Sequence, residues 1–117
     1  MSEFVLLYRF TPESRREAMG SPERAQAAMT KWRAWFEEMT SKGQLKNAGQ
    51  PLDDAGKVVR KHNTVTDGPY AETKDVIGGY SVIEARDLDH AAQIASGCPI
   101  IEGGGSVEVR PVRQMSL

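Results

Sequence analysis

The sequence has a single cysteine and two histidines, and this scarcity limits its chemistry. Cys98 alone cannot form an internal disulfide or a cysteine-based zinc cage. His62 and His90 do not occur at the H-x-H or H-x₃-H spacing of metal sites. The glycine-rich Gly103–Gly105 precedes an expected strand, whereas the dinucleotide-binding fingerprint opens a helix. We therefore expect neither a metal nor a cofactor.

Long apolar runs and a strong net charge are missing too. No stretch approaches the about 20 apolar residues that span a bilayer, so we expect no membrane partner. The net charge is −1 with no block of like charge, so we expect no nucleic acid partner. Met1–Phe4 lacks the basic start of a secretory signal. Together with the lone cysteine, this predicts a cytoplasmic protein.

The residues that are present are typical of one globular domain. The hydrophobic fraction of 39% and the charged fraction of 26% are ordinary, which excludes a disordered or fibrous chain. The length of 117 residues is too short for two domains. We expect a single domain over residues 1–117.

Hydrophobic periodicity predicts the order of helices and strands. Phe4–Phe10 is apolar on both faces and predicts a strand. Thr11–Gly20 is polar and is interpreted as a connection, and a long helix then runs from the N-cap Ser21 to Gly43. The later elements are a weak strand at Gln44–Leu52, strands at Lys57–Arg60 and Asn63–Thr66 around a turn at Lys61–Asn63, a strand at Tyr80–Arg86 after Gly78-Gly79, a helix from Asp87 to Gly97, and a strand at Ser106–Val112.

This order predicts an α+β fold, a ferredoxin-like sandwich with an antiparallel sheet and two helices on one face. Two helices cover only one face of such a sheet, yet Phe4–Phe10 is apolar on both. A second copy of the chain, related by a two-fold axis, supplies the same apolar patch as a cover. A bound apolar ligand is the alternative cover, and the two are compatible. We expect a homodimer.

Several motifs resemble one family. Asp67–Asp75, followed by Gly78–Tyr80, resembles the signature of the DGPF-domain branch of the YCII-related family. Gly97–Pro99 and Gly105–Pro111 extend the resemblance over nearly the whole chain. Tyr70 stands where the family usually has Phe, which keeps the aromatic ring and adds a hydroxyl.

The resemblance implies a ferredoxin-like subunit that dimerises sheet to sheet as a dimeric α+β barrel. It also implies kinship with small enzymes that bind organic substrates in a cleft over the sheet. Relatives often accompany extracytoplasmic-function sigma factors. Some carry a His–Asp pair proposed as catalytic, but neither His62 nor His90 sits in a matching motif.

Asp67 is the candidate catalytic residue. As a carboxylate at the mouth of a cleft it would act as an acid/base or as a hydrogen-bond acceptor for substrate. The alternative is a turn, in which Asp67 accepts backbone N–H bonds and Pro69 sets the local backbone. A cis bond between Gly68 and Pro69 is compatible with that turn.

Other polar side chains are candidates for binding a substrate. The candidate substrate-binding residues are Tyr8, Tyr70, Glu72, Lys74 and Arg110. Glu72 and Lys74 either frame a substrate or form a solvated pair. Arg110 either binds a carboxylate or phosphate, or pairs with Glu108 or Glu84.

Other conspicuous residues are explained by packing. Trp32, Trp35 and Phe36 recur at helical spacing, which is typical of a core. Cys98 follows a helix C-terminus, which raises a thiol pKa and argues against a nucleophile.

Two functions follow from these residues. The first is a small cofactor-free enzyme that acts on an organic metabolite through Asp67. The alternative is a non-catalytic ligand-sensing or protein-interaction module linked to sigma-factor regulation. The two are distinguished by whether Asp67 lines a pocket or is held by local bonds.

Overall fold

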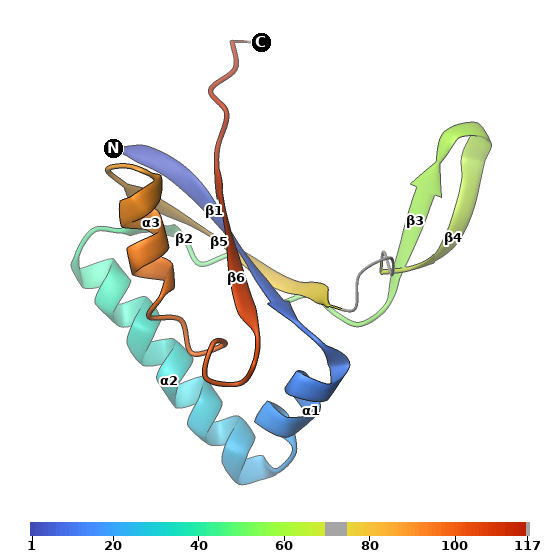
Figure 1. The fold of residues 1–117 in the computed structure, drawn as a ribbon, viewed down its shortest axis with the longest axis horizontal. Helices are drawn as coiled ribbons and strands as arrows, with labels where there is room; N and C mark the ends of the chain where they lie inside the picture. The colour runs from blue at the N-terminus through green and yellow to red at the C-terminus, as the bar shows by residue number, and fades with distance from the viewer. Residues whose placement is uncertain (70–74, 117) are drawn as a thin grey trace.

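The computed structural model describes residues 1–69 and 75–116 and shows an antiparallel α+β arrangement. The helices are α1 (Pro12–Met19), α2 (Pro22–Ser41) and α3 (Leu88–Ala95), with a 3₁₀ turn η1 (Lys61–Asn63). The strands are β1 (Ser2–Phe10), β2 (Leu45–Asn47), β3 (Gly56–Arg60), β4 (Thr64–Gly68), β5 (Val76–Ala85) and β6 (Ser106–Pro111). Figure 1 shows α2 and α3 together on one side of the main sheet.

The main sheet has the strand order β2-β5-β1-β6. β1 pairs antiparallel with both β5 and β6, and β2 pairs antiparallel with β5. With the helices on one face, this is the predicted ferredoxin-like fold. β3 and β4 form a separate two-stranded sheet.

The interpretation of Thr11–Gly20 as a connection is wrong, because Pro12–Met19 forms α1. The helix begins with a capping box in which Thr11 and Ser14 each satisfy the other's backbone N–H at 3.0 Å. Pro12 follows the cap, as Pro22 follows Ser21 at the start of α2. No residue of α1 is buried, so the apolar stripe that reveals an amphipathic helix is absent.

The limits of two strands differ from prediction by more than two residues. The weak strand at Gln44–Leu52 is reduced to β2, with one isolated bridge from Pro51 to Gly79. β5 begins before the glycine pair rather than after it. A Cβ at Gly78 would lie 1.8 Å from the ring of Phe10, so the glycine makes room for an aromatic side chain.

The core lies between the main sheet and helices α2 and α3. Alternate residues of β1 point into it, and Phe4, Leu6 and Tyr8 are buried. Trp35 and Met39 of α2 are buried against them. The predicted packing role of the aromatic residues on α2 is confirmed by these contacts.

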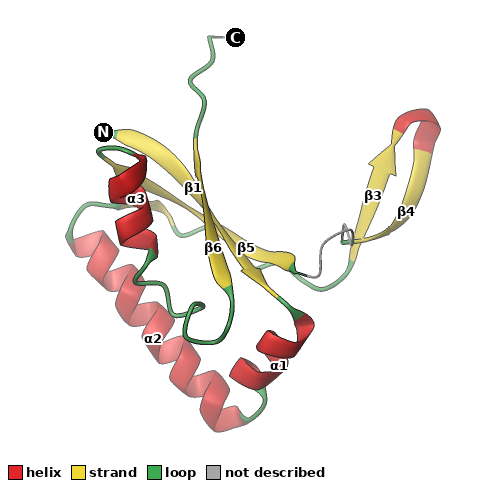
Figure 2. Cartoon of the chain, viewed as in Figure 1, coloured by secondary structure: helices red, strands yellow, loops and turns green. Residues whose placement is uncertain are grey.

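The opposite face of the sheet, which we call the open face, is partly apolar. Val5 pairs with Val82, and Leu7 pairs with Tyr80, so these four side chains share this face. All four are half-buried. Helices α2 and α3 lie on the other side of the sheet (Figure 2).

The β3–β4 hairpin extends away from α2 and α3 (Figure 2). Its turn is the predicted one, and both His62 (φ 60°) and Asn63 (φ 57°) have left-handed backbone conformations. Residues 61–63 form a three-residue loop between the paired residues Arg60 and Thr64. The peptide bond between Gly68 and Pro69, where the hairpin ends, is cis.

Candidate functional site

Asp67 lies on the projecting hairpin, near the end of β4. Its side chain is 91% exposed, and Oδ1 accepts a hydrogen bond from Lys57 Nζ at 2.6 Å. The two residues are directly opposite each other in the register of β3 and β4. Asp67 lines neither of the two grooves described below. Its role as an acid/base stays a prediction.

Three of the predicted site residues lie outside the described residues. These are Tyr70, Glu72 and Lys74, which follow the hairpin in the sequence. Asp75, the last residue of the same motif, is described and half-buried. Asp75 is therefore the motif residue that takes part in the network around Arg9 described below.

Tyr8 is buried on the helix-covered face of the sheet. Its hydroxyl donates to Ser81 Oγ at 2.7 Å, and the Ser81 hydroxyl donates to the carbonyl oxygen of Ala48 at 2.7 Å. Burial raises the pKa of Tyr8 above its ordinary value of 10.0, and the Ser81 hydrogen bond offsets only part of this rise. Tyr8 is thus a neutral residue of the core, and its hydroxyl already donates a hydrogen bond to Ser81.

The open face carries a network of charged side chains centred on Arg9. Arg9 donates to Asp75 through Nε at 3.3 Å and Nη2 at 3.1 Å, and to Glu108 through Nη1 at 2.9 Å. The hydrogen bond to Asp75 is the main cause of the raised pKa of Arg9. The Arg9 side chain is only 22% exposed, so this network is more sheltered than an ordinary surface ion pair.

Arg110 extends the same network. Its Nη1 donates to Glu108 Oε2 at 3.2 Å, the pairing that the sequence offered as an alternative to ligand binding. The register places Arg110 opposite Val5, on the open face. Tyr8 is buried on the other face, so the structure does not bring these two predicted residues into one site.

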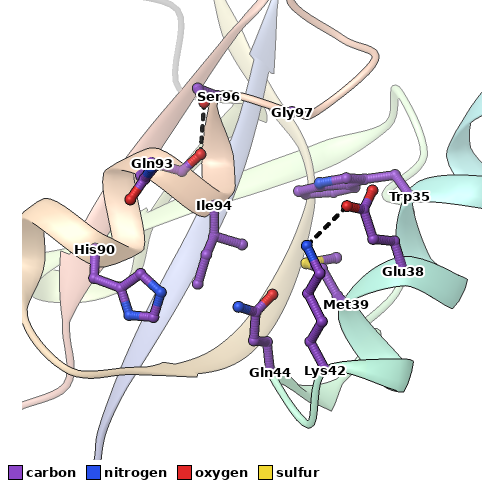
Figure 3. A pocket seen from close by; sticks show the side chains of 10 residues that line it. All are labelled: Trp35, Glu38, Met39, Lys42, Gln44, His90, Gln93, Ile94, Ser96 and Gly97. Carbon is purple, nitrogen blue, oxygen red and sulfur yellow. Dashed lines mark hydrogen bonds and ion pairs between the residues drawn. The ribbon is translucent and has the colours of Figure 1, made fainter.

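A groove of about 310 Å³ lies between α2 and α3. Figure 3 shows side chains of α3, including His90, facing those of α2. Trp35, Glu38, Met39, Lys42, Gln44, His90, Gln93, Ile94, Ser96 and Gly97 line it. Glu38 and Lys42 form an ion pair at 3.0 Å across one helical turn.

His90, which lines this groove, takes part in hydrogen bonds at the N-terminus of α3. Its Nδ1 accepts the backbone N–H of Arg86 at 3.1 Å, while Asp87 Oδ1 accepts the backbone N–H of His90 at 2.8 Å. The neutral ring therefore carries its proton on Nε2. These two bonds satisfy backbone N–H groups at the N-terminus of α3, which explains His90 structurally.

A second groove, of about 500 Å³, runs along α2 and is mainly apolar. Met29, Trp32, Arg33, Phe36, Glu37, Thr40 and Ser41 line it. All of these residues come from one helix, and converging polar groups from other elements are absent among the described residues. The aromatic side chains at its base also pack in the core, with Trp32 edge-on to Tyr8 at 4.8 Å.

Cys98 is buried and reduced in the described structure. Burial raises the pKa of its thiol from 9.0 to about 12. The thiol is therefore protonated near neutral pH, as expected for a packing residue. Across residues 1–69 and 75–116, His, Cys, Asp and Glu side chains form no group of three or more arranged to hold a metal.

The strand order and the helices on one face of the sheet make this chain a small ferredoxin-like α+β protein. Comparison with known families then identifies its family. The YCII-related domain model matches residues 2–116, so the chain belongs to the YCII-related family. No curated protein shows significant sequence similarity to it. The described helices include none that is long and apolar enough to cross a membrane.

One solved structure is similar to this chain over most of its length. It is the 5-chloro-2-hydroxyhydroquinone dehydrochlorinase TftG from Burkholderia phenoliruptrix AC1100, in complex with 2,5-dihydroxybenzoquinone. The identity is 16% and the TM-score 0.48, with 97% of this chain and 95% of that chain covered.

The central residues of the network were not singled out from the sequence as a site. Glu108 entered the sequence-based predictions only as a partner for Arg110. Asp75 closes the family motif, which is the one sequence signal that pointed to it. Only strand pairing brings Arg9 next to Glu108, because 99 residues separate them in the chain.

Proposed function

We propose that this protein binds a small organic molecule on the open face of its sheet. The observation that carries the proposal is the half-buried Arg9 network beside the apolar side chains of Leu7 and Tyr80. Small-molecule sites combine an apolar surface with a few fixed polar groups. The matching ligand has an apolar or aromatic body and one polar end that exchanges hydrogen bonds with the network.

A homodimer completes this site in the proposal. Val5, Leu7, Tyr80 and Val82 are half-buried on a sheet face that lies away from α2 and α3. A second copy placed face to face removes these side chains from water in both protomers. The ligand then lies at the edge of the interface, where the charged groups begin.

The enzymatic form of the proposal uses a carboxylate as acid/base. Asp75 and Glu108 are the carboxylates of the network, and Arg9 holds both in place. Asp67, predicted for this role, is fixed to Lys57 on the hairpin. Replacement of each carboxylate by its amide shows which of them acts on a bound molecule.

The non-catalytic alternative also has an observation in its favour. Arg9, Asp75, Glu108 and Arg110 are bonded to one another, so the described network is neutral and self-satisfied. Such a network suits ligand sensing, because binding then changes its hydrogen bonds without any proton transfer. Consumption of a bound compound supports the enzyme, and recovery of the same compound unchanged supports the sensor.

The test is a thermal-shift screen of the pure protein against pools of small organic acids, phenols and quinones. Compounds that raise the melting temperature of the wild type are then titrated against Arg9→Gln, Glu108→Gln and Asp67→Asn. We expect Arg9→Gln and Glu108→Gln to weaken binding at least about tenfold, a loss of roughly 1.4 kcal/mol. Asp67→Asn tests the sequence-based prediction in the same assay.

Arg16→Gln is the matched control, because it removes one exposed arginine from α1. It should leave binding unchanged. Each variant is compared with its own unliganded melting temperature, which separates loss of binding from loss of stability. Binding that survives Arg9→Gln, or a wild type that no pool stabilises, contradicts the proposal.

A further inference from the structure

Within residues 1–69 and 75–116, the strands of the β3–β4 hairpin pack mainly against each other and little against the rest of the protomer. Among the described strands, β3 and β4 pair with each other alone and form a sheet of their own. An isolated two-stranded hairpin is marginally stable at best in water. The radius of gyration is 15.7 Å, whereas about 13 Å is expected for a compact domain of this length.

One face of the hairpin is apolar at its centre. Val59 and Val65 are directly opposite each other, and their exposed fractions are 69% and 54%. Lys57 and Asp67 lie on the same face by register and form an ion pair beside the valines. Cross-strand pairs of β-branched residues and of opposite charges stabilise the hairpin itself, but the two valines stay largely exposed to water.

Charge distribution indicates what this element packs against. The hairpin, residues 56–68, holds three of the 15 basic residues and one of the 16 acidic residues. It is therefore net +2, and the remaining 12 basic and 15 acidic residues make the rest of the chain net −3. A basic arm and an acidic body of opposite sign attract each other between copies of one chain.

The direction in which the hairpin extends also favours a second copy of this chain as its partner. It extends on the side of the main sheet away from α2 and α3 (Figures 1 and 2), which is the side of the open face. Two uncovered apolar surfaces on one side of a protomer can cover each other in a two-fold dimer. Each arm then reaches across to the partner's sheet.

We propose that the β3–β4 hairpin is a dimerisation arm, in which Val59 and Val65 pack against a second copy of this chain beside its open face. The inference rests on the proposed function, because it takes the open face as the dimer surface. The arm closes over the edge of that face. It thereby brings the Asp67 side of the hairpin toward the partner's Arg9 network.

Sedimentation equilibrium of the full chain tests the arm. The double variant Val59→Ser/Val65→Ser is compared with Met19→Ser/Met29→Ser, which changes two exposed apolar residues on α1 and α2. We expect the hairpin variant to raise the dimer dissociation constant at least about tenfold and the control to change it less than about twofold. Circular dichroism should show both variants folded.

A photo-reactive amino acid at position 59 locates the contact independently of affinity. Isotopically light and heavy chains are mixed, irradiated and digested for mass spectrometry. We expect cross-links between a light and a heavy chain that fall in β1, β5 or β6. Cross-links confined to one chain overturn the inference.

Leu7→Arg separates this inference from the proposed function, because it places a charge on the open face itself. If Leu7→Arg dissociates the dimer and the hairpin variant does not, the arm is wrong and the face-to-face dimer stands. A monomeric wild type at micromolar concentration overturns the arm and the dimer together. Ligand binding at the Arg9 network is judged separately by the thermal-shift screen.

Discussion

The hydrogen-bond chain from Tyr8 through Ser81 to Ala48 predicts an unequal pair of substitutions. Ser81 is fully buried and is both acceptor for Tyr8 and donor to the Ala48 carbonyl. Ser81→Ala leaves the buried Tyr8 hydroxyl without a partner, which costs about 1–3 kcal/mol. Tyr8→Phe removes one hydrogen bond but leaves Ser81 bonded to Ala48, which costs about 1 kcal/mol.

The double variant sharpens this prediction. With both hydroxyls absent, only the Ala48 carbonyl loses a partner, and Ala48 is exposed to water. We therefore expect Tyr8→Phe/Ser81→Ala to cost about 1 kcal/mol less than the sum of the single variants. For a domain of this size, 1 kcal/mol corresponds to roughly 4 °C in melting temperature.

Urea unfolding followed by tryptophan fluorescence measures these differences. All variants are compared at one protein concentration, because the proposed dimer would add a concentration-dependent term. Ser41→Ala is the control: it removes an exposed hydroxyl that donates to the Glu38 carbonyl oxygen within α2, and should change the free energy of unfolding by less than about 0.5 kcal/mol. A Tyr8→Phe cost equal to or above that of Ser81→Ala, or strict additivity in the double variant, would refute the reasoning.

Three further predictions concern stability. Gly43 and Gly49 both have positive φ (69° and 72°), but a Cβ at Gly43 meets nothing within 4 Å, whereas one at Gly49 lies 1.7 Å from the Tyr80 carbonyl oxygen. Gly43→Ala should therefore cost about 1 kcal/mol and Gly49→Ala at least about 3 kcal/mol by chemical denaturation, and equal costs would contradict this explanation. The thiol pKa of Cys98 is about 12 in the folded state against 9.0 when unperturbed, so above pH 9 the unfolded state binds fewer protons and stability falls with rising pH. The stability difference between wild type and Cys98→Ala should shrink by about 1.4 kcal/mol between pH 7 and pH 10, and a constant difference would count against a buried thiol. Lys31→Ala breaks an exposed ion pair and should change the melting temperature by no more than roughly 2 °C.

Local signals in the sequence are strong where one residue type has one physical role. Ser21 and Pro22 predict the start of α2, and Asp87 predicts the start of α3, because these caps satisfy backbone groups within a few residues. The same signal, Thr11 followed by Pro12, was present at α1. That signal alone does not predict a helix, because α1 buries no residue and so has no apolar stripe to support the cap.

The candidate site was much less predictable, because it depends on contacts between distant strands. Arg9 and Glu108 meet only when β1 pairs with β6, and Asp75 joins them from the start of β5. Tyr8 and Arg110 seemed suitable partners in the sequence, yet the pleat of adjacent strands sends their side chains to opposite faces. A one-residue change in register would have reversed these assignments.

By itself the sequence determined the fold class, the family, the two main helices and the packing roles of Trp35 and Cys98. These follow from periodicity, capping and motif spacing, which act over short distances along the chain. Only the tertiary structure decided which charged groups meet on the open face and that Asp67 stands on a projecting hairpin. The physical reason is that strand register and hairpin direction are set by the pairing of whole strands, and no single segment encodes that pairing.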